Sequence, residues 1–202
     1  MVSKIIFGIT LGLVSSFLFQ GCGYTLQGSR NELLEKENIR RIYVQPMKNS
    51  TFKAGVEHVV YNALIRTLVA GRRVSIVKLP EEADAILIGS IVTAFAAISG
   101  STNMTSLQPG NVFADDKIVV GTIYVATLNC SFSLVRRNVP PGQRATVWSS
   151  SFSRTKSYPA AIQLDVPGTT SSLINESEFD RALGDLAGSM MLDLHESMLA
   201  MF

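Results

Sequence analysis

The chain has little of what enzymes and disulfide-stapled domains rely on. Its 202 residues include only two cysteines, Cys22 and Cys130, and two histidines, His58 and His195. No cysteine or histidine spacing typical of a zinc or redox site occurs. A G-x-S-x-G elbow, a P-loop and a dinucleotide-binding glycine fingerprint are also missing from the sequence. These absences argue against an enzyme, a metal site and a disulfide framework.

A strong charge of either sign is missing too. Lys and Arg number 18 against 16 Asp and Glu, which gives a formal net charge of +2. Proteins that bind nucleic acid normally carry a marked basic excess. We therefore expect no nucleic-acid partner. The length suits one domain with a sizeable core.

The N-terminal apolar run is too short for a typical membrane span. It covers about 15 residues, 5–19, whereas a transmembrane helix needs about 20. A small residue, Gly21, and then Cys22 follow it, as in bacterial lipoprotein precursors, although Phe19 and Gln20 depart from the usual cleavage box. We interpret residues 1–21 as a lipoprotein signal peptide. The alternative is an uncleaved membrane anchor.

Cleavage before Cys22 would leave a lipid-anchored protein. Cys22 would carry the covalent diacylglyceryl and N-acyl lipid, and no other cofactor is expected. Gly23 stands where an Asp would retain a lipoprotein in the inner membrane, so we expect the periplasmic face of the outer membrane. Residues 22–38 would be a lipidated tether and residues 39–202 a single domain.

Hydrophobic spacing predicts the elements of this domain. Helices are expected over 56–70 and from Asn175, where Glu178 completes a capping box. Strands are expected over 39–44, 74–79, 85–98, 117–137 and 144–156, with a polar loop at 99–116. This order predicts an α+β fold: a single two-layer sandwich whose mostly antiparallel, four- to five-stranded sheet is packed by two helices on one face.

Burial can also be read from the pattern. From Ala126 to Leu134 apolar and polar residues alternate, which places Cys130 among buried small hydrophobes. Residues 119–125 are apolar or neutral on both faces, so loops of the domain or a partner should cover them.

The two histidines fall on the two predicted helices. They are either solvated positions or, if they face each other, part of a metal site that has no third ligand at ligand spacing.

Basic residues occur in pairs at predicted strand ends or edges. Together such pairs can grip phosphate or carboxylate groups, and arginine does so with two parallel hydrogen bonds. The alternative is that they solvate strand ends and protect sheet edges from unwanted pairing. The pairs are Arg40-Arg41, Arg72-Arg73, Arg136-Arg137, and Arg154 with Lys156.

Five short segments, in order, resemble one protein family. They are Cys22-Gly23-Tyr24-Thr25-Leu26-Gln27-Gly28, the strand and Pro-x-x-Asn-x-Thr loop Ile42–Thr51, the helix acid Glu57, Ala83–Gly89, and Val147-Trp148 followed by Tyr158. Together they are similar to the lipopolysaccharide-assembly lipoproteins, LptE. The resemblance covers essentially the whole chain after Gly21.

The resemblance implies a non-catalytic outer-membrane lipoprotein with two partners. These are the β-barrel protein LptD, whose assembly it would assist, and lipopolysaccharide, which the pair would deliver to the outer leaflet. Candidate contacts to lipopolysaccharide phosphates are Arg72, Arg73, Arg136, Arg137, Arg154 and Lys156. No family motif aligns at these six positions, so they come from the pairing of basic residues alone.

Two other functions stay open. An envelope lipoprotein could instead scaffold another outer-membrane machine, such as a secretin or a barrel-assembly complex. A cell-wall hydrolase would require a cleft that gathers His58, His195 and acidic side chains.

Overall fold

The computed structural model describes residues 34, 37–105, 117–139, 141–160 and 170–199, all within one compact unit that spans Asn31–Phe202. The strands are β1 (Arg41–Val44), β2 (Lys48–Asn49), β3 (Ser75–Val77), β4 (Ala85–Thr105), β5 (Lys117–Arg136) and β6 (Thr146–Pro159). The helices are α3 (Val56–Gly71), the short 3-10 helix η1 (Pro80–Glu82) and α4 (Thr170–Leu199). The signal peptide, Cys22 and most of the predicted tether lie outside the described residues.

The sheet is mixed. Its order is β3-β1-β4-β5-β6, and β2 pairs with β4 off this path. The pairs β1–β3, β1–β4 and β2–β4 are parallel, whereas β4–β5 and β5–β6 are antiparallel. The α+β class is therefore confirmed, but the expected four to five strands become six, and the sheet is less antiparallel than predicted. The additional strand is the two-residue β2. The parallel pairing follows from the β1–α3–β3 unit, because a crossover through a helix returns the chain parallel to its start.

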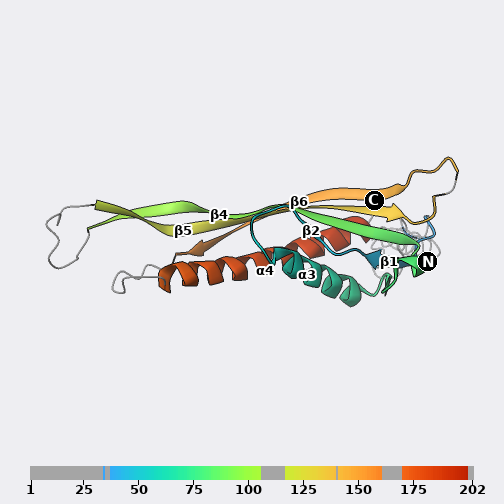
Figure 1. Cartoon of the computed structure of the whole chain (residues 1–202), viewed down its shortest axis with the longest axis horizontal. Coiled ribbons are helices and arrows are strands. Elements are labelled where there is room, and N and C mark those ends of the chain that lie inside the picture. Colours follow the sequence, from blue (N-terminus) through green and yellow to red (C-terminus); the bar gives the residue numbers. More distant parts are fainter. Residues whose placement is uncertain (1–33, 35–36, 106–116, 140, 161–169, 200–202) are drawn as a thin grey trace, which may run out of the picture. The chain divides into compact units, whose positions relative to one another are not determined.

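Both helices cover the same face of the sheet (Figure 1), as expected. Their apolar stripes and the alternating residues of β5 form one core, because each buries the face that would otherwise meet water. Most predicted core residues are buried, Cys130 included: Val56, Val60, Ala63, Leu64 and Leu68 on α3, Phe179, Leu183, Leu186, Met190, Leu194 and Met198 on α4, and Ala126, Leu128, Cys130, Phe132 and Leu134 on β5. Four others that were predicted to face the core are half-buried: Val59, Thr67, Trp148 and Phe152.

Three boundaries differ from the predictions by three residues or more. β4 continues to Thr105, so residues 99–105 of the expected polar loop are strand, paired with the first part of β5. β6 runs to Pro159 and not to 156, and α4 begins at Thr170, which leaves the Asn175–Glu178 box inside the helix. Backbone pairing and helix extension need no apolar side chains, so polar Ser, Thr and Asn residues can join either element.

The apolar part of β5 stays uncovered by the described residues. Val119 is 68% exposed and Ile123 45% exposed, and Ile98 on β4 is 60% exposed. Tyr124 is an exception, because its ring stacks on Tyr158 of β6 with 5.7 Å between centroids. Of the two covers expected for residues 119–125, the domain's own elements supply little among the residues described.

Candidate functional site

Two of the six candidate basic residues pair with acidic side chains of α4. Arg154 and Lys156 lie on the face of β6 that the helices cover, in register with Leu128 and Ala126. The Arg154 Nε donates to Asp193 of α4 at 3.1 Å, and the Lys156 ammonium donates to Asp185 of the same helix. The pKa of Asp185 is lowered by this hydrogen bond and charge. These two residues fasten α4 to the edge strand.

The other four candidates gather at one end of the sheet. β1, β3 and β4 begin there and β5 ends there, because Arg41 pairs with Ser75, Ile42 with Ala85, and Ala85 with Arg136. The sheet thus brings together residues that are far apart in sequence. We call this cluster the arginine end; it consists of Arg40, Arg41, Arg72, Arg73, Arg136, Arg137 and Arg144.

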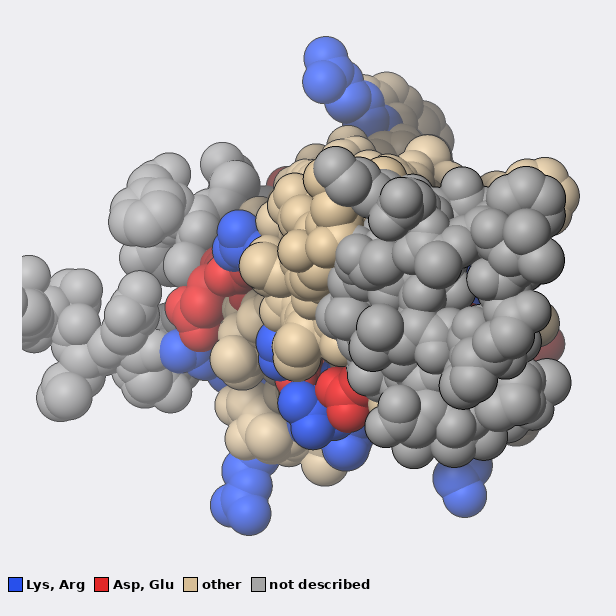
Figure 2. All heavy atoms as spheres, turned by 90° about the vertical axis from the view of Figure 1, so that its left-hand side faces the viewer, with Lys and Arg blue, Asp and Glu red and all other residues tan. Residues whose placement is uncertain are grey.

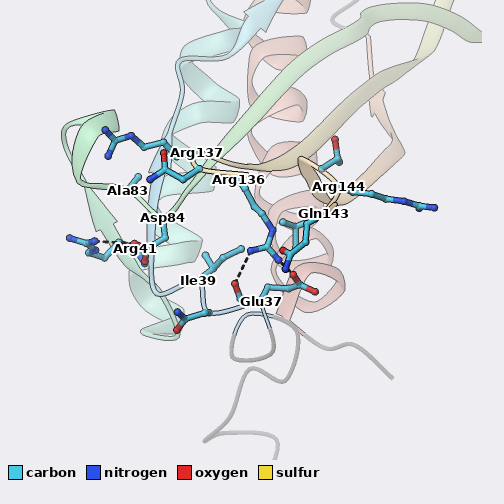
Figure 3. A pocket seen from close by; sticks show the side chains of 13 residues that line it. Glu37, Ile39, Arg41, Ala83, Asp84, Arg136, Arg137, Gln143 and Arg144 are labelled. Atoms are coloured by element: carbon cyan, nitrogen blue, oxygen red, sulfur yellow. Dashed lines mark hydrogen bonds and ion pairs between the residues drawn. The ribbon is translucent and has the colours of Figure 1, made fainter. Parts of the chain in front are cut away.

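A pocket of about 820 Å³ opens at the arginine end (Figure 3). Four arginines and two acids are among its lining residues: Arg41, Arg136, Arg137, Arg144, Glu37 and Asp84. Arg136 points into the pocket and pairs with Glu37, whereas Arg144 extends away from it. Arg137 donates to the backbone oxygen of Glu81. Counting charges, the lining carries two more positive than negative groups.

Asp84 builds one wall of this pocket. Its carboxylate accepts hydrogen bonds from the backbone N–H of Arg40 at 3.0 Å and of Arg41 at 2.9 Å, and from the Arg41 guanidinium at 2.9 Å. Partial burial opposes ionisation, but these three bonds outweigh it and hold the pKa of Asp84 below its ordinary value. Asp84 therefore clamps the start of β1 to the start of β4.

Replacing Asp84 with asparagine should lower the free energy of unfolding by about 1–2 kcal/mol at pH 7, because charge-assisted hydrogen bonds are lost. A carboxylate with a lowered pKa stabilises the fold above its unfolded pKa of about 3.9. The difference between wild type and variant should thus shrink as the pH falls from about 5 through the lowered pKa. Urea unfolding at several pH values measures it. Glu82→Gln, on the exposed η1, is the control, and an equal pH dependence in both variants would contradict the clamp.

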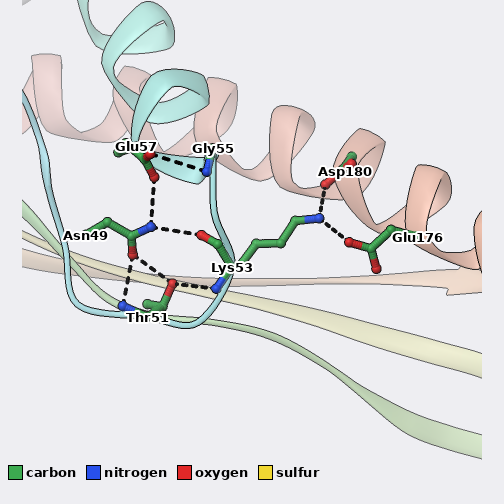
Figure 4. Close-up of polar contacts among 7 residues, drawn as sticks. All are labelled: Asn49, Thr51, Lys53, Gly55, Glu57, Glu176 and Asp180. Atoms are coloured by element: carbon green, nitrogen blue, oxygen red, sulfur yellow. Dashed lines mark hydrogen bonds and ion pairs between the residues drawn. The ribbon is translucent and has the colours of Figure 1, made fainter.

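A second polar cluster shapes the loop before α3 (Figure 4). The Asn49 amide donates to the Lys53 backbone oxygen at 2.8 Å and to Glu57 at 2.7 Å. Its oxygen accepts from the Thr51 N–H at 2.9 Å and hydroxyl at 2.8 Å. Glu57 in turn accepts from the N–H of Gly55, whose φ of 85° suits glycine. The Pro-x-x-Asn-x-Thr loop and the helix acid are thus one hydrogen-bonded unit at the start of α3.

Lys53 connects this loop to α4. Its ammonium contacts Glu176 and lies 2.5 Å from Asp180, and it sits 5.3 Å from the centroid of the Phe179 ring. Burial alone would lower the pKa of Lys53. The hydrogen bonds and charges of the two carboxylates outweigh burial, so the pKa lies above its ordinary value. No pairing of basic residues signalled this contact, because Lys53 stands alone in the sequence.

The two histidines are not brought together as a site. His58 is exposed, as the solvated interpretation predicted, but that interpretation was wrong for His195, which is 7% exposed. The His195 ring lies against Gly71 at the end of α3, where a Cβ on residue 71 would overlap it. Within the described part of the chain no group of three or more His, Cys, Asp or Glu side chains could hold a metal ion.

The opposite face of the sheet is rich in hydroxyl groups, and no helix of the described part covers it. It presents Thr127, Ser131 and Ser133 on β5 and Ser149, Ser151, Ser153 and Thr155 on β6. The Ser90 and Ser131 hydroxyls lie 2.8 Å apart, beside a hollow of about 430 Å³. Two apolar side chains, Ile88 and Phe95, are 38% and 47% exposed beside them. We call this surface the open face.

On the side of the molecule near the β4–β5 hairpin, charged side chains of both signs are mixed (Figure 2). Seen from the tip of the β4–β5 hairpin, blue and red side chains lie beside one another, and single basic side chains stand out at the rim (Figure 2). No helix of the described residues has both the length and the apolar character to cross a membrane.

The chain was compared with curated proteins and with solved structures. A comparison with curated proteins found no match. Solved structures that resemble the chain include a PelC dodecamer from Paraburkholderia phytofirmans, with 14% identity, coverage of 81% of this chain and 89% of that one, and a TM-score of 0.43. The chain is also similar to the rare lipoprotein B from Shewanella oneidensis, with 13% identity, coverage of 78% of this chain and 96% of that one, and a TM-score of 0.39. A minor lipoprotein from Acinetobacter baumannii has 13% identity, coverage of 79% and 93%, and a TM-score of 0.41.

The family comparison concerns most of the chain. The family model LptE: Lipopolysaccharide-assembly matches residues 39–194, which include every described strand and helix except the last residues of α4. This range contains the Asn49 cluster, the arginine end from residue 39 onward and the open face. The protein therefore belongs to the LptE family of lipopolysaccharide-assembly lipoproteins.

Proposed function

We propose that this protein is a non-catalytic lipoprotein of the outer membrane that partners an LptD-like β-barrel. It assists the assembly of that barrel and the delivery of lipopolysaccharide to the outer leaflet. The family match over residues 39–194 is the observation that carries the proposal. Residues 1–21 would be removed, and the lipid on Cys22 would hold the domain at the periplasmic face.

The open face supports a barrel partner. The lumen of an outer-membrane barrel is lined by polar side chains, and a surface of hydroxyl groups can exchange hydrogen bonds with such a wall. Ile88 and Phe95 add exposed apolar area to the same surface, and apolar cores are typical of protein interfaces. The exposed Ile123 of β5, which alternates in step with Thr127, extends it toward the hairpin tip.

The basic residues support lipopolysaccharide as the second partner. Arg72, Arg73, Arg136 and Arg137 share the arginine end, and we propose them as the main contacts to lipopolysaccharide phosphates. Arg154 and Lys156 lie apart from the arginine end and fasten α4 to β6, so we expect a smaller contribution from them.

The proposal is tested by purifying the full-length protein from membranes in mild detergent. Mass spectrometry should identify one large β-barrel protein in near-stoichiometric amount, together with lipopolysaccharide. Depletion of the protein should lower the mature barrel and surface lipopolysaccharide together. Recovery of a secretin in place of the barrel, or normal barrel and lipopolysaccharide levels after depletion, would contradict the proposal.

A further inference from the structure

Arg136 meets an anion within its own chain. Its Nη1 donates to the Glu37 backbone oxygen at 3.1 Å, and its Nη2 pairs with the Glu37 carboxylate. The Arg136 side chain is 14% exposed and that of Glu37 is 29% exposed. The Glu37 carboxylate at Nη2 occupies a place that a phosphate oxygen could take, because both anions accept hydrogen bonds from a guanidinium.

Buried residues before and after Glu37 in the sequence fix the position of its backbone. Leu34 and Ile39 are 1% and 3% exposed, and the Ile39 N–H donates to the Leu34 oxygen at 2.7 Å. The Glu37 carboxylate itself contacts only Arg136 among the residues described. Asp84 differs, because two backbone N–H groups and Arg41 engage it. Of the two acids of the pocket, Glu37 is therefore the one that can leave.

The rest of the pocket favours an incoming anion. The lining keeps a surplus of two positive charges with Glu37 in place, and one more when Glu37 turns outward. Arg144, an exposed residue of the β5–β6 turn, also lines the pocket, but its side chain extends away from it. A volume of about 820 Å³ is large enough for a head group that carries phosphate and sugar or glycerol.

We propose that this pocket is a phosphate-binding site in which Glu37 is a displaceable internal competitor. The phosphate takes the place of the Glu37 carboxylate at the Arg136 Nη2, and that carboxylate moves into water. This deepens, and rests on, the proposed function, since lipopolysaccharide supplies phosphate groups. Anionic phospholipids carry the same chemistry.

Binding of three probes to the full-length protein in detergent tests the proposal. The probes are inorganic phosphate, phosphatidylcholine vesicles with and without phosphatidylglycerol, and purified lipopolysaccharide. Glu37→Gln should tighten binding of phosphate-bearing probes about threefold or more, since the competitor loses its charge while its backbone contact stays. Arg136→Gln should weaken binding about tenfold. Arg181→Gln, an exposed arginine on α4, is the control and should change binding less than about twofold.

The three probes distinguish lipopolysaccharide from anionic phospholipid as the bound ligand, and a parallel measurement distinguishes the pocket proposal from the proposed function. A response to lipopolysaccharide alone, or to phosphatidylglycerol vesicles as well, supports the site and identifies its source of phosphate. Unchanged binding of every probe by Glu37→Gln and Arg136→Gln overturns it. Arg137→Gln, expected to weaken binding about threefold, replaces Arg136→Gln if that variant does not fold. Recovery of the barrel protein is measured in parallel. If no barrel is recovered but the variants still change binding of the phosphate-bearing probes as expected, the proposed function is refuted and the pocket proposal is not.

Discussion

Replacing Ser151 with arginine should reduce recovery of the barrel partner at least about tenfold. Ser151 is exposed on the open face, directly opposite Ser131 in the register of β5 and β6. If the open face packs against a barrel wall, the new guanidinium loses its water without gaining a partner. That penalty is several kcal/mol, and about 1.4 kcal/mol already corresponds to tenfold in affinity. Barrel recovered per molecule of purified protein is the measurement.

The isolated variant should remain folded. An exposed substitution away from special features changes the free energy of unfolding by less than about 0.5 kcal/mol. The matched control is Ser177→Arg, which makes the same change at an exposed position of α4, in the helix layer. An equal loss of barrel from both variants, or none from either, would contradict the assignment of the open face as the interface.

Replacing Asn49 with alanine should lower the free energy of unfolding by about 2–4 kcal/mol. The side chain makes four hydrogen bonds, and each contributes roughly 0.5–1.5 kcal/mol net, somewhat less where water can replace the lost partner. Thr51 and the Lys53 carbonyl would lose their partner in a partly buried loop, and Glu57 would lose the amide that helps to lower its pKa. Denaturant unfolding followed by circular dichroism gives the value.

Asn62→Ala is the control for Asn49. Asn62 is exposed on the surface of α3, where alanine is the better helix former, so stability should stay equal or rise slightly. Barrel recovery from the Asn49 variant should fall only in proportion to its unfolded fraction. A stable Asn49 variant that no longer recovers the barrel would instead make the loop an interface.

Several features were accessible from sequence because they depend on local pattern. The apolar stripe from Phe179 to Met198 and the alternation from Ala126 to Leu134 identified the buried faces correctly. The parallel pairing of β1 with β3 had a signal too, since a strand, a helix and a strand within residues 41–77 form the usual parallel crossover.

Other features depend on contacts that no local pattern reveals. The salt bridges of Lys53 with Asp180 and of Lys156 with Asp185 join residues distant in sequence, so the pairing of basic residues could not reveal them. The start of α4 was placed too late because Asn175 and Glu178 form a capping pattern that the helix runs through. The role of Glu37 needed the fold, since only β5 brings Arg136 beside it.

The burial of Cys130 has a consequence for life in an oxidising compartment. Burial raises the pKa of its thiol to about 12, so only about one molecule in 10⁵ carries the thiolate at pH 7. Thiol–disulfide exchange proceeds through the thiolate, and the sheet and helices also block access to the sulfur. In the folded domain Cys130 should therefore react slowly with oxidants, and at the proposed periplasmic location it should not form mixed disulfides. Unfolding would expose its thiol, and folding buries it again.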